Sequence, residues 1–304
     1  MRTSAPRLIA PPVEEQPIYP YARVWRSLAL FGASLLIVTM VMWILDSFLL
    51  DIERTLYTPI AMGVALIPAG LWALFALLPE RGALEPRRGL LAVFAVSALV
   101  ANGVTLPVIE GVLQIERWLP LADLVTRIIG YTVAVGVAHE ISKYLVVRLL
   151  TWDSLLRTRM DSIAYVTAAA VGYATALNIV AALRDPAAPA AAAFAVFGTI
   201  AFSLAPGLIV GYGLGEARFS NPNAFLLVIS FALAALIFGV ATALRSNLVN
   251  AGFVLVEQVQ TSAPSPIFGL AISAILLFGM SIIVASLIAS AERREAEIRA
   301  GEAK

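Results

Sequence analysis

Three ionisable residues lie within five positions of one long apolar stretch of the chain: His139, Glu140 and Lys143. His139 is the only histidine of the sequence, and Lys143 is one of only two lysines. If the stretch crosses a membrane, each charged side chain raises the free energy of insertion by about 2.5–3.5 kcal/mol. A segment that keeps such residues is therefore the first place to look for a functional site.

The spacing of these residues puts all three on one broad face of a helix. Lys143 follows Glu140 by three positions and His139 by four, and an α-helix has 3.6 residues per turn. One interpretation is a catalytic site between helices, reached by water, with Glu140 as acid or base beside Lys143 and with His139 as metal ligand or proton carrier. The other is that Glu140 and Lys143 neutralise each other and hold helices together. The residues alone leave both open.

A comparison with zinc chemistry narrows the first interpretation. In His-Glu-x-x-His, two histidines four apart bind zinc and the glutamate acts as base. Here the fifth position is Lys143, and a protonated lysine has no lone pair to give a metal. Any metal at His139 would need further ligands from other helices. The chain contains no cysteine, which excludes disulfides, thiolate catalysis and cysteine-ligated metals.

The composition is that of a membrane protein. Of the 304 residues, 60% are hydrophobic and only 13% are charged, whereas soluble domains are about 25% charged. A membrane-spanning helix needs about 20 apolar residues, and bilayer hydrocarbon satisfies no backbone hydrogen bonds. We therefore expect an all-α, polytopic bundle of about eight transmembrane helices, surrounded by membrane lipid and with no nucleic-acid partner. The qualifying segments are about 27–50, 57–79, 89–113, 121–149, 162–183, 190–214, 224–244 and 267–290.

The positive charges between these segments give the orientation. Fourteen lie on one side of the expected bundle: Arg2, Arg7, Arg23, Arg26, Arg81, Arg87, Arg88, Arg157, Arg159, Arg218, Arg293, Arg294, Arg299 and Lys304. Four lie on the other: Arg54, Arg117, Arg184 and Arg245. Because cytoplasmic loops carry the excess of lysine and arginine, we predict a multi-pass protein of the cell membrane with both termini in the cytoplasm.

The chain divides into three regions. Residues 1–26 are polar and proline-rich and predict a disordered cytoplasmic tail, with no cleaved signal peptide, so the first span would act as the targeting signal. Residues 27–290 form the transmembrane domain, and residues 291–304 predict a cytoplasmic helical tail. Within the domain, Ser246 to Gln260 could be an interfacial helix on the outer surface or an ordinary loop.

Three motifs in order carry a resemblance to a known family. The first is His139-Glu140-Ile141-Ser142-Lys143. The second combines Asp161-Ser162-Ile163-Ala164-Tyr165 with Gly172-Tyr173-Ala174-Thr175-Ala176-Leu177-Asn178. The third is Gly211-Tyr212-Gly213-Leu214-Gly215-Glu216-Ala217-Arg218-Phe219-Ser220. In this order, over residues 134–242, the chain resembles the PrsW family of intramembrane metalloproteases, which are relatives of the CAAX prenyl proteases.

The chain departs from the family pattern where that pattern supplies metal ligands. Where the family has its first glutamate, this chain has His139, and the glutamate before the family's asparagine is Leu177. The family's histidines correspond to Ser203 and Phe238. The resemblance implies a zinc ion held by those glutamates and histidines, and a catalytic zinc needs about three protein ligands.

The family-like residues that remain define the predicted site. The resemblance implies that Glu140 and Lys143 would be the catalytic residues, and that His139 would be the metal ligand if zinc binds at all. It further implies that the neighbouring spans five and six bring Asn178 and Ser203 into the same cavity, with Asp161 also lining it.

Three functions are consistent with these features. The lost ligand positions favour a pseudoprotease that binds transmembrane or juxtamembrane segments of other proteins, and the many small residues of span five suit helix packing with a partner or inside the bundle. The first alternative is an active protease in which Glu140 activates a zinc-bound water. The second is a proton-coupled transporter that uses His139, Glu140 and Lys143 as a relay, with Pro206 interrupting a helix.

Overall fold

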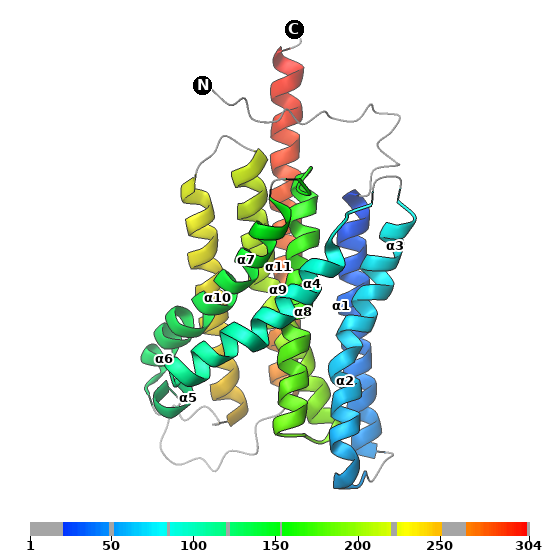
Figure 1. The fold of residues 1–304 in the computed structure, drawn as a ribbon, viewed down its shortest axis with the longest axis vertical. Coiled ribbons are helices and arrows are strands. Elements are labelled where there is room, and N and C mark those ends of the chain that lie inside the picture. Colours follow the sequence, from blue (N-terminus) through cyan, green and yellow to red (C-terminus); the bar gives the residue numbers. More distant parts are fainter. Residues whose placement is uncertain are drawn as a thin grey trace.

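The computed structural model describes residues 21–48, 52–83, 86–119, 122–152, 154–219, 224–250 and 266–302, and this part of the chain contains helices but no strand. Eight helical segments in it are long and apolar enough to cross a membrane (Figure 1). The predicted all-α, polytopic bundle is thereby confirmed. The elements are α1 (Tyr21–Phe48), η2 (Arg54–Leu56), α2 (Tyr57–Trp72), η3 (Ala73–Leu77), α3 (Leu78–Arg81), α4 (Leu90–Val100), η4 (Ala101–Thr105), η5 (Pro107–Val112), α5 (Ile115–Trp118), α6 (Leu124–Gly130), η7 (Tyr131–Gly136), α7 (Val137–Thr151), α8 (Arg159–Arg184), α9 (Pro189–Phe219), α10 (Ala224–Asn250) and α11 (Pro266–Glu302).

The predicted segments correspond to these elements with shifted ends. Helix α1 begins at Tyr21, inside the predicted tail, and the rest of that tail lies outside the described residues. Helix α10 continues to Asn250, so only the start of the segment 246–260 is described. Helix α11 runs without a break through residue 290 to Glu302. Both Tyr21 and Glu302 lie at the same end of the bundle, as an even number of spans requires (Figure 1).

Helices α8 and α9 form the centre of the bundle. They have the largest buried share of all spans, 67% and 83%, and they pack against each other. Helices α4 and α2 cover α8, while α10, α11 and α1 cover α9. The small residues of span five serve this internal packing, because Ala168, Ala169, Ala170 and Ala174 have no exposed surface. They are therefore not available to a partner helix.

Two glycines allow helices to come unusually close. A Cβ atom on Gly172 of α8 would overlap the backbone carbonyl of Phe94 on α4. A Cβ atom on Gly239 of α10 would overlap the Thr132 side chain of η7. Glycine is required at both crossings because any side chain would push the helices apart. These contacts hold span three against α8 and span four against α10.

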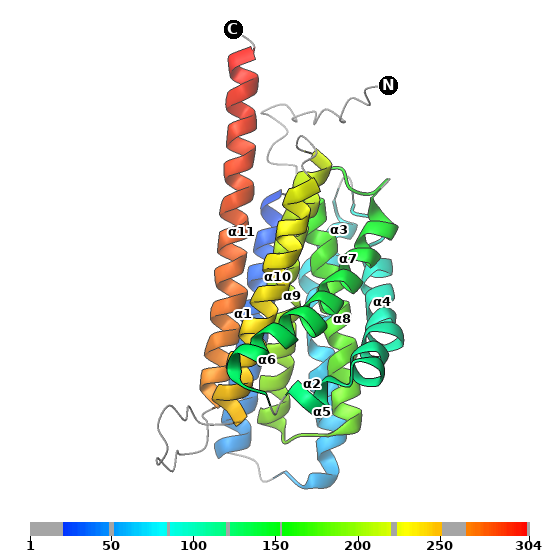
Figure 2. The same cartoon turned by 90° about the vertical axis from the view of Figure 1, so that its left-hand side faces the viewer.

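Spans three and four run obliquely across one face of the bundle (Figures 1 and 2). Both contain π-helical turns, in which the hydrogen bonds skip one residue more than in an α-helix: η4 and η5 in span three, η7 in span four. Asp123 caps the start of α6 by accepting hydrogen bonds from the amides of Val125 and Thr126. The hydroxyl and backbone of Thr126 lower the pKa of this carboxyl, which lies outside the span.

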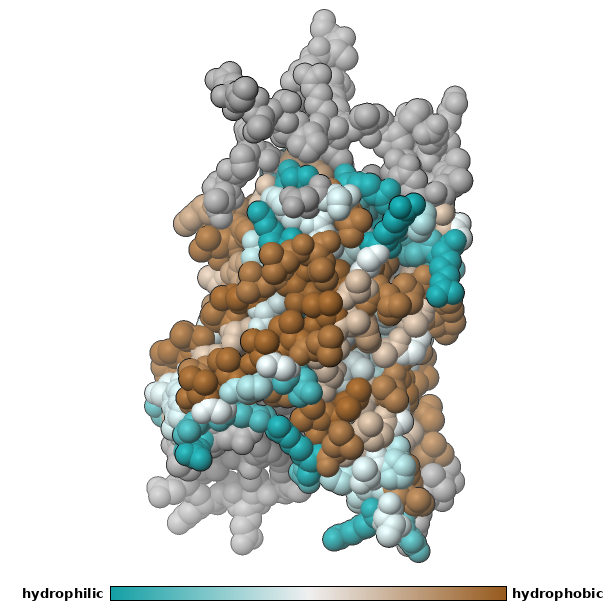
Figure 3. Space-filling model, viewed as in Figure 1, coloured by the Kyte–Doolittle hydropathy of each residue, from teal (hydrophilic) through white to brown (hydrophobic). Residues whose placement is uncertain are grey.

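The surface agrees with a membrane position. Apolar side chains cover the middle of the face shown in Figure 3, and hydrophilic side chains gather towards its two ends. At the end opposite the termini, Arg184 of α8 donates two hydrogen bonds of 2.7 and 2.8 Å to the carboxylate of Glu110 on η5. The molecule is therefore a multi-pass membrane protein. The start of α1 and the end of α11 lie at the end of the bundle that carries Arg81, Arg87, Arg88, Arg157, Arg159 and Arg218, which we call the arginine-rich end (Figure 1).

Candidate functional site

His139, Glu140 and Lys143 lie on α7, immediately after the π-helical turn η7. All three are buried, with exposed fractions of 8%, 1% and 3%. Because α7 packs against α4, α8 and α9, the residues face the interior of the bundle rather than lipid. A π-helical turn rotates the helix that follows it and is frequent at functional sites. Here it sets the direction of the first turn of α7.

Lys143 joins α7 to the central pair through Ser203 of α9. Its Nζ donates to Glu140 Oε1 at 2.7 Å and to the backbone carbonyl of Ser203 at 2.6 Å. The Ser203 hydroxyl in turn donates to the backbone carbonyl of Ala170 on α8, at 3.0 Å. The structure therefore unites Glu140, Lys143 and Ser203, which are separated by up to 63 positions in the sequence. The lysine charge is neutralised by Glu140 inside the bundle.

Pro206 and Gly207 of α9 lie close in sequence to the Ser203 carbonyl. Proline lacks an N–H group, so the carbonyl of Phe202, four residues before Pro206, has no donor in its own helix. A Cβ atom on Gly207 would lie 3.2 Å from Val166 Cγ1 and 3.8 Å from Lys143 Nζ, so this glycine allows α8 to pack closely beside the ammonium. Helix α9 is nevertheless continuous from Pro189 to Phe219, and Pro206 does not break it.

His139 is enclosed by aromatic rings. Its imidazole centroid lies 5.1 Å from the ring of Tyr173 on α8 and 5.0 Å from the ring of Phe238 on α10. Phe238 also contacts Phe202, the neighbour of Ser203, at 6.5 Å between centroids. The positions that correspond to metal ligands in the family resemblance, His139, Ser203 and Phe238, therefore surround one small region. In this chain that region is lined by aromatic carbon.

Two buried polar atoms of the predicted site have no hydrogen-bond partner among the described residues. They are Glu140 Oε2 and Asn178 Nδ2. Asn178 is buried on α8, five residues after Tyr173, and no hydrogen bond within the described chain joins it to Glu140, Lys143 or Ser203. Its placement in a shared cavity with them stays a prediction.

A further contact fixes α7 against span three. Thr105 of η4 donates from its hydroxyl to the hydroxyl of Ser142 at 2.8 Å. Thr105 is 2% exposed, so this bond is buried beside the ionisable residues. Span three thus belongs to the wall of the site, although the sequence motifs begin only in span four.

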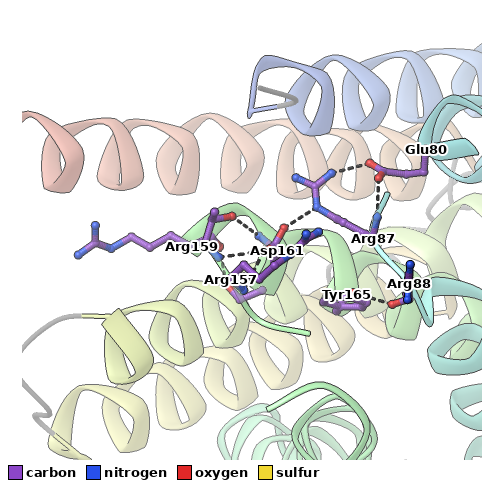
Figure 4. A network of polar contacts seen from close by, with 9 residues as sticks. Glu80, Arg87, Arg88, Arg157, Arg159, Asp161 and Tyr165 are labelled. Atoms are coloured by element: carbon purple, nitrogen blue, oxygen red, sulfur yellow. Dashed lines mark hydrogen bonds and ion pairs between the residues drawn. The ribbon is translucent and has the colours of Figure 1, made fainter. Parts of the chain in front are cut away.

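Asp161 occupies a different place from the other predicted site residues. It begins α8 in a reciprocal cap with Thr158, and it also accepts a hydrogen bond of 2.9 Å from the Arg157 amide. Arg87 donates to Asp161 at 2.7 Å and to Glu80 at 2.5 Å, and these contacts join spans two, three and five at the arginine-rich end (Figure 4). The Asp161 carboxylate therefore organises that end of the bundle.

Arg87 is the cation at the centre of this network and is 6% exposed. Burial works against its charge, but the carboxylates of Asp161 and Glu80 outweigh burial and raise the pKa of Arg87 above its ordinary value. In the same network, the Tyr165 hydroxyl donates to the carbonyl of Arg88 at 2.7 Å. The pattern Thr158-x-x-Asp161 is a capping box, a signal by which the sequence could have indicated this role.

The residues around His139 do not fit a zinc ion. Within the described residues, no group of three or more histidine, aspartate and glutamate side chains could hold a metal, and the chain has no cysteine. A catalytic zinc takes three protein ligands and a water. Glu140 Oε1 already binds an ammonium group, and two aromatic rings lie about 5 Å from the imidazole of His139. What the arrangement can do is hold a charge pair in a closed, apolar interior.

Comparison with known proteins identifies a family that the chain matches. The family model described as PrsW family intramembrane metalloprotease matches residues 85–280, more than half of the chain. No curated protein and no solved structure matches the chain.

Proposed function

Since the chain belongs to the PrsW family of intramembrane metalloproteases, we propose that it is a pseudoprotease. It keeps the helical scaffold of the family and binds membrane-embedded or juxtamembrane segments of other proteins without cleaving them. The described residues do not supply a zinc site, and the proposed pseudoprotease therefore has no metal-bound water to attack a peptide bond.

One observation carries this proposal: the hydrogen bonds of Glu140 Oε1 and Lys143 and the ring contacts of His139 all lie within the bundle, while Glu140 Oε2 has no partner among the described residues. Lys143 holds Glu140 Oε1 and the Ser203 carbonyl, and His139 lies between two aromatic rings. A general base must reach the proton that it abstracts, and a ligand must present its lone pair to the metal. A buried charge pair with good hydrogen bonds instead suits a rigid scaffold.

Asn102 supports the binding part of the proposal. It lies in η4, near the middle of span three, and its side chain is exposed where lipid would surround it. Several hydroxyls within the spans, such as that of Thr175, donate to a carbonyl of their own helix, whereas no hydrogen bond of the Asn102 side chain is found among the described residues. Asparagine side chains in membranes hydrogen-bond across helices. The neighbouring Gly103 has open space around it, which allows a partner helix to approach.

The test is the zinc content of the detergent-purified protein, measured by elemental mass spectrometry beside a His139→Ala variant. We expect both proteins to hold less than about 0.1 zinc per chain, because two donors do not make a site that needs three. A second variant restores the donors of the family pattern: His139→Glu, Leu177→Glu, Ser203→His and Phe238→His together. We expect this variant to bind about one zinc per chain.

About one zinc per wild-type chain, lost in His139→Ala, would overturn the proposal. That result would favour an active protease with Glu140 as base, and a cleavage assay would be the next experiment. The hypothesis of a proton-coupled transporter gains no support from α9, because this helix runs through Pro206 without the interruption that the hypothesis expected.

A further inference from the structure

Trp152 follows the last residue of α7 at the arginine-rich end of the bundle and has an arginine from each of two helices beside its ring. The guanidinium carbon of Arg148 lies 3.2 Å from the ring centroid, and that of Arg218, in the last turn of α9, lies 5.1 Å from it. The indole therefore gathers two positive charges from helices that are far apart in the sequence. Neither arginine has a role in the site around Lys143.

No carboxylate among the described residues forms an ion pair with Arg148 or Arg218. This distinguishes them from Arg87 and Arg159 at the same end, which are bound to Asp161 and Glu216. The Nε atom of Arg218 is buried and has no hydrogen-bond partner in the described chain. Two cations on one ring repel each other unless an anion lies near both.

We propose that Trp152, Arg148 and Arg218 form a binding site for the phosphate of an anionic phospholipid in the cytoplasmic leaflet. The charge bias assigns this end of the bundle to the cytoplasm, where anionic lipids attract basic side chains. Tryptophan suits the headgroup layer because its ring is apolar and its N–H is polar. Arginine matches phosphate with its planar fork of donors, while the ring holds the guanidinium of Arg148 in place.

The acyl chains of such a lipid have apolar surface beside the headgroup. Leu145 and Leu149 lie on the outer face of α7 near Trp152 and are 46% and 80% exposed. A phospholipid bound by its phosphate can therefore lay its chains along α7. A free phosphate ion would gain only the charge contacts, which is why the site is assigned to a lipid.

The experiment measures quenching of Trp152 by brominated lipids in vesicles. The Trp152 signal is the difference between the wild type and Trp152→Phe, reconstituted in phosphatidylcholine with increasing fractions of brominated phosphatidylglycerol or brominated phosphatidylcholine. Because each of the two arginines near an anionic surface favours binding roughly fivefold, half-quenching should need about 25-fold less brominated phosphatidylglycerol than brominated phosphatidylcholine. Salt should weaken this preference in the wild type, because screening reduces attraction between exposed charges.

The variants test the residues themselves. Arg148→Gln with Arg218→Gln should remove the preference for phosphatidylglycerol. The control Arg81→Gln, an exposed arginine at the same end, should keep it. Equal quenching by the two lipids in the wild type, or a preference that persists in the double variant, overturns the proposal. Competition by inorganic phosphate at millimolar concentration would instead identify a free-anion site and overturn the lipid assignment. If the double variant does not fold, the wild-type lipid comparison and its salt dependence decide.

Discussion

The buried pair of Glu140 and Lys143 allows a direct test of whether His139, Glu140 and Lys143 stabilise the fold or take part in a reaction. We consider the variants Lys143→Met and Glu140→Leu, each alone and both together. At 2.7 Å and an effective dielectric constant of about 20, the attraction between the two charges is about 6 kcal/mol, before the loss of hydration is subtracted. Removing one partner of a buried pair usually costs about 3–5 kcal/mol, because it leaves an uncompensated group behind.

The two variants should therefore not be additive. Each single substitution is expected to lower the free energy of unfolding by about 3 kcal/mol or more, whereas the double variant, with apolar residues of similar size, should lie within about 1.5 kcal/mol of the wild type. The coupling energy in the double-mutant cycle then amounts to about 4.5 kcal/mol or more. The assay is reversible unfolding in mixed micelles, followed by circular dichroism.

The control pair is Glu110 and Arg184 at the opposite end, whose side chains are 32% and 59% exposed. Glu110→Gln should change stability by less than about 1 kcal/mol, because exposed pairs contribute little. A Lys143→Met protein within about 1 kcal/mol of the wild type, or a coupling energy near zero, would refute the scaffold reasoning. If these residues formed an active site, the single substitutions should leave the free energy of unfolding unchanged or raise it, as often happens when strained catalytic groups are replaced.

Two further predictions concern the packing and the polar network of the arginine-rich end. Gly172→Ala should destabilise the protein by about 1–3 kcal/mol, because its Cβ would overlap the backbone of Phe94, whereas Gly70→Ala, which meets open space, should be neutral or stabilising in the same unfolding assay. Arg87→Met should cost about 3 kcal/mol, since it leaves the buried Asp161 carboxylate without its cation. The folded-state pKa of Arg87 is raised above its ordinary value, so its contribution is fully present below the pKa of the unfolded chain and is lost only as pH rises through the folded-state pKa. The difference between wild type and Arg87→Met should therefore be constant from about pH 6 to 9, and a marked change in that range would contradict the assignment.

The number and order of the spans could be predicted from the sequence, because a run of about 20 apolar residues is typical of a membrane-spanning helix. The pairing of Glu140 with Lys143 could also be predicted, since residues three apart share a helix face. The spacing could not show that the pair is closed by the backbone of Ser203. Every residue has a carbonyl, so residue types do not indicate which carbonyl a lysine on another helix will reach.

The surroundings of His139 were also beyond prediction from spacing. Tyr173 and Phe238 come from different helices, and their approach depends on how α8 and α10 pack against α7. The π-helical turn η7 adds a rotation that a regular 3.6-residue repeat does not include. For Asp161, the family pattern predicted a residue that lines the cavity. The local sequence, with Thr158 three positions earlier, instead indicates the helix cap that its carboxylate forms in the structure.

Helix α11 is longer than a membrane requires, and this gives it a mechanical property. Its 37 residues span about 55 Å at 1.5 Å per residue, against about 30 Å of hydrocarbon. It packs along α9, the most buried helix, and extends beyond the other helices at the arginine-rich end (Figure 2). It can therefore act as a lever. A change of about 10° in its tilt would move the far end by about 10 Å, so small rearrangements within the bundle would become large displacements at the arginine-rich end.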